Sequence, residues 1–354
     1  MALLYSNLKF LDQPKHMAAL RNKEVVAPVH IRIKPINYCN HNCWYCAYRY
    51  DNLQLGEDMD VADQIPHDKI FEIVDDIIEM GVKAVTFSGG GEPLLYKPLP
   101  DVITQLAGAG IKVASLTNGA NLKGKVGDAF AKHGTWVRVS LDAWDDASYA
   151  KSRGIKDGAY TKLLENMRNF LKTGTKCVLG VSLIIDDVNY EHITEVCEIM
   201  KDVGVNHIKL SPVVVGNSVE ENNTYHSKIK DVIGQQIEDV KKLETADFSI
   251  LNHYHDLPDL FLKEYDTCPF LQFLTVIGGD CGVYTCQDKA FTESGMLGSL
   301  KEMRFKDFWF SEENRQHLFS FNPQNSCQHH CVTHSKNLAL KEFLSLDQDH
   351  SQFV

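Results

Sequence analysis

The chain lacks any hydrophobic run of the length that crosses a membrane. A membrane helix needs about 20 consecutive apolar residues, and no stretch of the 354 residues approaches this. The first twenty, MALLYSNLKFLDQPKHMAAL, contain no apolar run long enough for a signal peptide. We therefore expect no contact with membranes and a cytoplasmic location. In that reducing compartment, clustered cysteines serve as metal ligands or catalysts more often than as disulfides.

Positive charge is also scarce. Lys and Arg number 36 against 47 Asp and Glu, a net charge of -11, which argues against nucleic acid as a partner. The chain has no internal repeat and no low-complexity tract. Its length and its 44% hydrophobic content suffice for one large domain and a smaller one.

Short apolar runs rich in β-branched residues alternate with amphipathic stretches through the first two thirds of the chain. One such stretch, 66–81, predicts a helix that begins near Pro66 and ends at Gly81. Strands that alternate with helices form parallel βαβ units, and continuously apolar strands are buried on both faces. The sequence therefore predicts an α/β fold with a partial (β/α)6 barrel. The six expected strands lie at 29–36, 84–93, 112–119, 136–143, 177–185 and 207–214.

Polar and glycine-rich segments follow several of these strands directly: the first cysteine cluster, SGGGEP, TNG and SLDA. In a β/α barrel, the carboxyl ends of the strands carry the active site. After about residue 245 the alternation of strands and helices stops. We therefore expect a barrel at 29–245, preceded by an extension at 1–28 and followed by a smaller, cysteine-ligated domain at 246–354.

Three cysteines lie within eight positions directly after the first strand. Cys39, Cys43 and Cys46 have the spacing C-x3-C-x2-C, with no fourth cysteine nearby. Ligation by four cysteines is usual for a cubane iron–sulfur cluster, so three leave one iron open to chelate a small molecule. The alternative is a zinc site completed by His41 or a distant residue. SGGGEP at the end of the next strand favours the cluster, because glycines let the backbone approach a ligand closely.

With these two motifs in this order, one strand apart, the chain resembles the radical S-adenosylmethionine superfamily over essentially its whole length. The family has an aromatic residue before the last cysteine of the loop, here Tyr45. The resemblance implies a [4Fe-4S] cluster on Cys39, Cys43 and Cys46 whose open iron binds S-adenosylmethionine. One electron from the cluster then cleaves this cofactor, and the resulting 5′-deoxyadenosyl radical abstracts a hydrogen atom from the substrate.

The resemblance also implies which residues bind S-adenosylmethionine. The glycine motif holds the methionine amino group through backbone atoms, Ser140 lies near the carboxylate or ribose, Arg153 binds the carboxylate, and Ser211 lies near the adenine. The residues themselves leave other interpretations open: a local turn bond for Ser140 and a solvated surface charge for Arg153. The full set expected at the cofactor is Tyr45, Gly90, Gly91, Glu92, Thr117, Asn118, Ser140, Asp142, Arg153 and Ser211.

The C-terminal part resembles the auxiliary-cluster extension called SPASM, or its shorter twitch form. Cys268 and Cys286 would flank a β-hairpin, and with Cys327 and Cys331 they would hold a second [4Fe-4S] cluster. The longer form needs a further C-x2-C-x5-C run, which this chain does not have. The resemblance therefore implies one auxiliary cluster.

Other residues compete for this second site. Cys281 stands where the hairpin glycine of the family is usual, so it is a rival of Cys286 as a ligand. A structural zinc knuckle is the alternative to a cluster. Cys177 and Cys197 are expected to be core residues. The histidines close enough to compete are His329, His330 and His334.

Asp288 is the candidate catalytic base, because dehydrogenation of an alcohol requires a group that takes the hydroxyl proton. It lies two residues after Cys286. In peptide- and sulfatase-modifying relatives an acid follows that cysteine directly, whereas this chain has Gln287. Other candidates for the pocket are Arg49, His253 and His255, each with a structural role as the alternative.

These features predict a radical S-adenosylmethionine enzyme that oxidises or rearranges a small polar substrate of the sugar or cyclitol kind. About thirty residues precede the first strand, too few for the leader-peptide domain of many peptide-modifying relatives. A flavodoxin- or ferredoxin-like protein would supply the electron. The alternatives are a peptide- or protein-modifying enzyme, a non-catalytic iron–sulfur electron carrier, and a zinc-binding interaction module. The GGEP and SLDA segments argue against an electron carrier, because an electron carrier needs no binding site for a cofactor at the strand ends.

Overall fold

The computed structural model describes residues 5–49, 56–254, 261–350 and 353. The strands among these residues form one open sheet in the order β10-β9-β8-β1-β2-β3-β4-β5-β6-β7. Neighbours from β8 to β7 are parallel, and β9 is antiparallel to both of its neighbours, β8 and β10. The predicted α/β fold with an unclosed barrel sheet is therefore confirmed. The strands are β1 (His30–Ile33), β2 (Ala84–Phe87), β3 (Lys112–Thr117), β4 (Gly134–Ser140), β5 (Val178–Ile185), β6 (His207–Pro212), β7 (Ser249–Asn252), β8 (Leu274–Ile277), β9 (Gly282–Tyr284) and β10 (Met296–Ser299).

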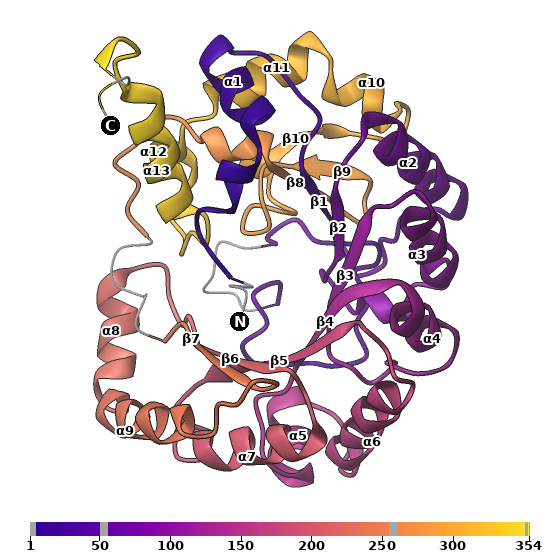
Figure 1. The fold of residues 1–354 in the computed structure, drawn as a ribbon, viewed down its shortest axis with the longest axis vertical. Helices are drawn as coiled ribbons and strands as arrows, with labels where there is room; N and C mark the ends of the chain where they lie inside the picture. Colours follow the sequence, from indigo (N-terminus) through magenta and orange to yellow (C-terminus); the bar gives the residue numbers. More distant parts are fainter. Residues whose placement is uncertain (1–4, 50–55, 255–260, 351–352, 354) are drawn as a thin grey trace.

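Helices connect the parallel strands and lie on the outer side of the curved sheet (Figure 1). The helix predicted at 66–81 is α2, which follows Pro66 and ends at Gly81, where φ is +74°. Glycine adopts this left-handed conformation without steric cost, so it ends the helix as predicted. The α-helices are α1 (Pro14–Asn22), α2 (His67–Met80), α3 (Leu99–Gly108), α4 (Gly124–His133), α5 (Asp146–Arg153), α6 (Ala159–Lys172), α7 (Ile193–Val203), α8 (Val219–Ser227), α9 (Lys230–Lys241), α10 (Phe305–Trp309), α11 (Glu312–Ser320), α12 (Pro323–Ser326) and α13 (His334–Ser345). Short 3-10 helices occupy η1 (Lys9–Asp12), η2 (Pro93–Leu95), η3 (Pro269–Gln272) and η4 (Glu293–Gly295).

The two faces of β1 differ in polarity. Ile31 and Ile33 are fully buried in the main hydrophobic core, together with Ile70 and Ile73 of α2. Successive strand residues point to opposite faces, so Arg32 lies on the inner face, away from the helices. The inner face of this predicted strand therefore carries a basic side chain.

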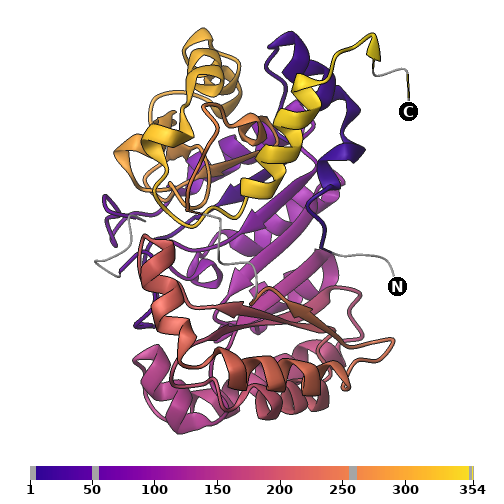
Figure 2. The ribbon, with the colours of Figure 1, turned by 90° about the vertical axis from the view of Figure 1, so that its left-hand side faces the viewer.

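The C-terminal residues add strands at both edges of the barrel sheet. β7 lies beyond residue 245 yet pairs in parallel with β6, with Ile250 opposite Ile208. β8 and β9 form the hairpin predicted between Cys268 and Cys286, and β8 pairs with β1 at the other edge. Figure 2 shows the segment that follows β8 gathered at one end of the molecule, with α8 and α9 at the other. The boundary between two domains at residue 245 stays a prediction.

The N-terminal extension packs against the C-terminal segment. Phe10 and Leu20 form a small hydrophobic core with Phe273 and Leu340. This contact joins the two ends of the chain, next to β1. Among the residues that the structure describes, no helix is long and apolar enough to cross a bilayer.

Candidate active site

The three clustered cysteines lie in an irregular loop directly after β1. A turn brings Cys43 and Cys46 together through a hydrogen bond from Cys46 N to Cys43 O at 3.2 Å. His41 N donates to Cys39 Sγ at 3.4 Å, and the buried His41 ring packs edge-on against Tyr149, with centroids 5.9 Å apart. All three cysteines are half-buried. The loop therefore holds three thiols at the carboxyl end of β1.

The glycine motif runs alongside this loop. Gly91 N donates to Ile36 O at 3.0 Å, which ties the chain after β2 to the chain after β1. A Cβ atom added to Gly91 would lie 2.0 Å from Tyr38 O, and one added to Gly90 would lie 2.4 Å from Asn37 Oδ1. Only glycine allows the two segments to approach so closely. In this structure the glycines contact the cysteine loop itself.

Glu92 joins the ends of β2 and β3. Its carboxylate is buried and accepts hydrogen bonds from Thr117 Oγ1 at 2.6 Å, Asn118 N at 2.7 Å and Leu94 N at 3.0 Å. Burial raises the pKa of Glu92, while these three donors act in the opposite direction. The carboxylate therefore binds groups of the protein itself, and it fixes the segment Thr117–Asn118 beside the glycine motif.

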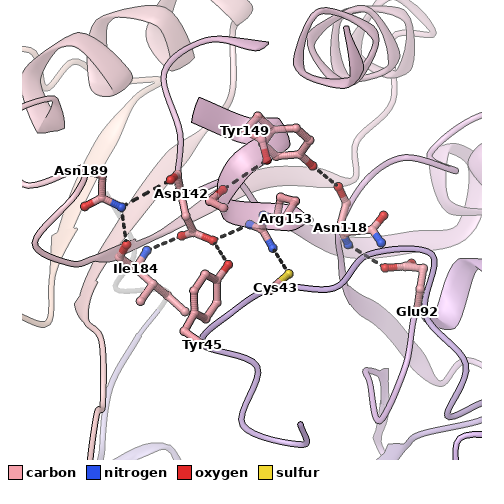
Figure 3. Close-up of polar contacts among 10 residues, drawn as sticks. Cys43, Tyr45, Glu92, Asn118, Asp142, Tyr149, Arg153, Ile184 and Asn189 are labelled. Atoms are coloured by element: carbon pink, nitrogen blue, oxygen red, sulfur yellow. Dashed lines mark hydrogen bonds and ion pairs between the residues drawn. The ribbon is translucent and has the colours of Figure 1, made fainter. Parts of the chain in front are cut away.

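A buried ion pair connects the end of β4 to the cysteine loop (Figure 3). Asp142 Oδ2 accepts hydrogen bonds from Tyr45 Oη and Arg153 Nη2, and Asp142 Oδ1 accepts one from Ile184 N. Asp142 has φ +60°, a left-handed conformation that is strained for this residue type and is held by these contacts. Arg153 Nη1 lies 3.3 Å from Cys43 Sγ. One guanidinium therefore bridges the carboxylate and the thiol.

The charges of this network reinforce one another. Burial alone would lower the pKa of Arg153, but Tyr45, Asp142 and Cys43 together hold it well above its usual value. Burial raises the pKa of Asp142, and Arg153 opposes that rise. Arg153 is 3% exposed, so the interpretation as a solvated surface charge is wrong. The guanidinium therefore places a permanent positive charge next to the sulfur of Cys43.

Three more of the expected cofactor residues lie near the carboxyl ends of the strands. Asn118 Nδ2 lies 3.9 Å from Cys39 Sγ and donates to Asn40 Oδ1 at 2.8 Å. Ser140 ends β4 and is half-buried. Ser211 Oγ on β6 is buried and has no hydrogen-bond partner among the described residues. Such an unsatisfied buried hydroxyl is costly unless a ligand or water pairs with it.

The spacing of the loop thiols does not suit zinc. A tetrahedral zinc ion with Zn–S bonds of about 2.3 Å would hold its sulfur ligands roughly 3.8 Å apart. Among the described residues, Cys39, Cys43 and Cys46 are not a group whose ligand atoms lie within 4.8 Å of one another. Thiols that are wider apart fit the corners of an iron–sulfur cubane better than a single ion.

A second set of cysteines surrounds one cavity in the C-terminal part. Cys268, Cys286, Cys327 and Cys331 all line it, from the segments before η3, after β9 and after α12. Asn337 Nδ2 donates to Cys268 Sγ at 3.1 Å. Burial raises the pKa of all four thiols, so a metal that binds them must displace protons. The four predicted auxiliary ligands therefore converge, although they lie far apart in the sequence.

Cys281 does not line this cavity. It occupies the turn of the hairpin between β8 and β9 with φ +62°, the conformation for which the related hairpins use glycine. Its side chain is 4% exposed and lies in the main hydrophobic core. The geometry therefore favours Cys286 over Cys281 as the thiol available at the cavity.

His329 lies at the same cavity and has unusual surroundings. It is 3% exposed, and neither ring nitrogen has a hydrogen-bond partner among the described residues. Burial lowers the pKa of His329 to about 3, so the ring is neutral at pH 7. One ligand atom each from His329, Asp288 and Cys286 lies within 4.8 Å of the others. His330 contacts the ring of Phe261, and His334 contacts the ring of Tyr265. His329 is therefore the histidine that competes with the cysteines as a ligand at this cavity.

The remaining pocket candidates differ in their surroundings. Arg49 Nη1 donates to His41 O at 3.0 Å and to Asn42 Oδ1 at 3.3 Å, so it braces the cysteine loop. His253 lies after β7, with its ring 6.4 Å from that of Tyr5. His255 lies outside the described residues.

Lys34 is a site residue that the sequence analysis did not identify. It directly follows β1, is 1% exposed, and donates hydrogen bonds to Tyr48 Oη and Gly89 O. It therefore joins the cysteine loop to the glycine motif. The signal in the sequence is the alternation in HIRIK, where basic residues take every second position of a strand.

Comparison with known proteins identifies the family. The family model described as Radical SAM superfamily matches residues 33–221, more than half of the chain. The chain therefore belongs to the radical S-adenosylmethionine superfamily. It is an enzyme of the class that uses a [4Fe-4S] cluster and S-adenosylmethionine, so the interpretation as a non-catalytic electron carrier no longer applies.

Similar proteins in this family act on nucleotides according to their names. A probable GTP 3',8-cyclase of Metallosphaera sedula is 27% identical over 195 residues, which are 53% of this chain and 57% of that protein. An S-adenosylmethionine-dependent nucleotide dehydratase of Lacinutrix mariniflava is 27% identical over 164 residues, 43% of this chain and 32% of that protein. The chain thus spans little more than half the length of the first relative and a third of the second.

Solved structures share the fold over nearly the whole chain. SuiB of Streptococcus suis, bound to the precursor peptide SuiA, superposes with a TM-score of 0.63 at 17% identity, covering 94% of this chain and 78% of that one. Native anSMEcpe with bound AdoMet superposes with a TM-score of 0.58 at 14% identity, covering 90% of this chain and 96% of that one. The shared fold includes the C-terminal segment as well as the barrel.

Proposed function

We propose that Cys39, Cys43 and Cys46 hold the [4Fe-4S] cluster of this enzyme, and that the chain abstracts a hydrogen atom from a small polar substrate. The observation that carries this proposal is the set of three half-buried thiols without a fourth, next to the buried guanidinium of Arg153. When bound and reduced, the cluster supplies the electron that cleaves S-adenosylmethionine into methionine and a 5′-deoxyadenosyl radical.

The protein's own part is to bind and orient S-adenosylmethionine. Arg153 Nε is buried and has no hydrogen-bond partner among the described residues, so it is the donor available for the carboxylate of the cofactor. Ser211 Oγ is likewise unpaired and suits the adenine. The backbone of Gly90 and Gly91 is proposed to bind the amino group. Asp142 acts on the cofactor through Arg153 and Tyr45, which it holds in place.

The second set of cysteines is proposed to hold an auxiliary [4Fe-4S] cluster with no open iron. Its support is the convergence of Cys268, Cys286, Cys327 and Cys331 on one cavity. Asp288 is proposed as the base that takes a substrate proton, since its Oδ2 is buried and lacks a partner among the described residues. Burial raises the pKa of Asp288, which brings the carboxyl group closer to the range useful for proton transfer.

A small polar substrate of the sugar or cyclitol kind fits the names of the similar enzymes, which refer to GTP and to a nucleotide, each of which contains a sugar. Modification of a peptide is the second candidate, since SuiB shares the fold and was solved with a precursor peptide. A flavodoxin- or ferredoxin-like reductant stays a prediction.

The proposed function is tested by assaying 5′-deoxyadenosine. The protein is reconstituted with iron and sulfide, reduced with dithionite and supplied with S-adenosylmethionine. We expect product from the wild type and none from the variant in which Cys39, Cys43 and Cys46 are replaced by Ala. The matched control replaces the core residues Cys177 and Cys197 by Ala, and it should keep the activity. Equal product from the loop variant and the wild type would contradict the proposal.

A further inference from the structure

The charged side chains at the inward positions of the barrel strands are predominantly basic. The outer positions of β1 to β6 contribute to the main hydrophobic core, so the positions that alternate with them face inward. Asp and Glu are absent from these inward positions. The basic residues there, or directly after the strand, are His30, Arg32, Lys34, Lys112, Arg138, His207 and Lys209, and Asp186 directly follows β5.

Arg32 and Arg138 are the least compensated of these cations. The Nε atoms of both are buried and have no hydrogen-bond partner among the described residues. Arg138 Nη1 lies 3.4 Å from the hydroxyl of Tyr5, a neutral group. No ion pair links either guanidinium to a carboxylate in the part of the chain that the structure describes. Both side chains are half-buried, and buried donors without a partner are costly, so this pair points to an anion that is supplied from outside.

The surrounding charges agree with this view. Burial lowers the pKa of Arg32 and the nearby Arg138 adds to this, while burial and then Arg32 lower the pKa of Lys34. The carboxylate that opposes them is Asp288.

The cations lie between the two cysteine sites. Lys34 donates to the hydroxyl of Tyr48, two residues after Cys46, and that hydroxyl donates to Gln287 O at 3.2 Å, next to Cys286. Burial lowers the pKa of Arg32, and the nearby charges of Asp288 and Cys286 act in the opposite direction. A molecule bound at these side chains therefore lies where the radical could reach it from one side and Asp288 from the other.

We propose that the substrate carries a phosphate group, and that Arg32 and Arg138 bind this group inside the barrel. This inference rests on the proposed function and narrows it to phosphorylated small molecules. Guanidinium groups suit the role because their planar forks bind two oxygen atoms of an oxyanion at once. The negative net charge of the whole chain does not oppose it, since the local excess inside the barrel is positive.

The test measures binding of inorganic pyrophosphate by isothermal titration calorimetry to the protein loaded with iron, sulfide and S-adenosylmethionine. We expect binding to the wild type, and a loss of affinity of about tenfold or more in Arg32→Gln and in Arg138→Gln, because each loses a hydrogen bond between charged groups. The matched control is Arg168→Gln, which removes an exposed guanidinium that pairs with Asp202 on the outside of the barrel. Its affinity should equal that of the wild type.

Three results would overturn the proposal: no binding of pyrophosphate to the wild type at millimolar concentration, an equal loss in Arg168→Gln, or succinate binding as tightly as pyrophosphate, which would indicate a carboxylate instead. If Arg32→Gln does not fold, as judged by circular dichroism, Arg138→Gln decides alone. Formation of 5′-deoxyadenosine by the wild type is measured separately. If it forms while pyrophosphate does not bind, the phosphate inference fails and the proposed function stands.

Discussion

Arg153 Nη1 lies 3.3 Å from Cys43 Sγ, although the two residues are 110 positions apart in the sequence. The same guanidinium is paired with Asp142 through Nη2. Because both partners of that ion pair are almost completely buried, it keeps a fixed positive charge at one thiol of the cysteine loop. The end of β4 and the start of α5 are thereby coupled to the loop after β1.

The ion pair between Asp142 and Arg153 should be essential for stability. In Asp142→Asn, Arg153 keeps its charge but loses the buried counter-charge, and the free energy of unfolding should fall by about 3–5 kcal/mol. Urea denaturation measures this change. The exposed pair of Asp202 and Arg168 provides the control, and Asp202→Asn should change stability by about 1 kcal/mol or less. Similar values for the two variants would show that burial does not strengthen the first pair.

Gly91 should not tolerate a side chain. In Gly91→Ala the new Cβ atom would meet Tyr38 O at 2.0 Å, a backbone atom that cannot move aside without shifting the cysteine loop. We expect the variant to lose iron and S-adenosylmethionine binding. Gly108→Ala is the control, because no atom lies within 4 Å of its added Cβ. Iron content like that of the wild type in Gly91→Ala would contradict the close contact of the two loops.

Iron counts distinguish the ligands of the second site. The variant that lacks Cys39, Cys43 and Cys46 should keep about four irons, against about eight in the wild type. In that background, Cys286→Ala should lose the remaining iron and Cys281→Ala should keep it, since only Cys286 lines the cavity. The reverse outcome would move the ligand to the hairpin turn. Tetrahedral zinc in place of iron would refute an auxiliary cluster.

His207 should make the protein sensitive to mild acid. Burial lowers its pKa from 6.5 to about 4, and Arg138 adds to that effect, while Nε2 lies 2.9 Å from the Tyr5 hydroxyl. As the pH falls, the unfolded chain takes up this proton first, so stability that is present above pH 6.5 is lost towards pH 4. This shift corresponds to a loss on the order of 3 kcal/mol. His207→Gln should flatten this decline in denaturation curves. Parallel pH profiles for the two proteins would argue against a neutral, buried His207.

The sequence predicts the barrel because its signals are local. Pro66 and Gly81 bound α2 through fixed backbone preferences, and the β-branched runs form the six strands expected. The sequence analysis did not predict β7 (Ser249–Asn252), since four residues after the last regular helix give too short a pattern. It pairs only because β6 offers a free edge.

The surroundings of the site residues depend on contacts between distant segments. The sequence names Arg153 and Asp142 but does not reveal that they pair, and it leaves Cys281 and Cys286 as rivals. Folding separates these two cysteines: one is at a turn that points into the core, and the other is at the cavity beyond β9. Lys34 was missed although basic residues alternate in HIRIK, because a lysine at the end of a strand resembles a solvated strand end.

We expect S-adenosylmethionine to bind at a cluster held by Cys39, Cys43 and Cys46. Electron paramagnetic resonance of the reduced protein, recorded with and without S-adenosylmethionine, tests it most directly. The cofactor should change the spectrum of the wild type, and the variant lacking these three cysteines should retain a cluster signal that the cofactor leaves unchanged. A wild-type spectrum that S-adenosylmethionine does not alter, or a variant spectrum that it does alter, would contradict binding of the cofactor at this cluster.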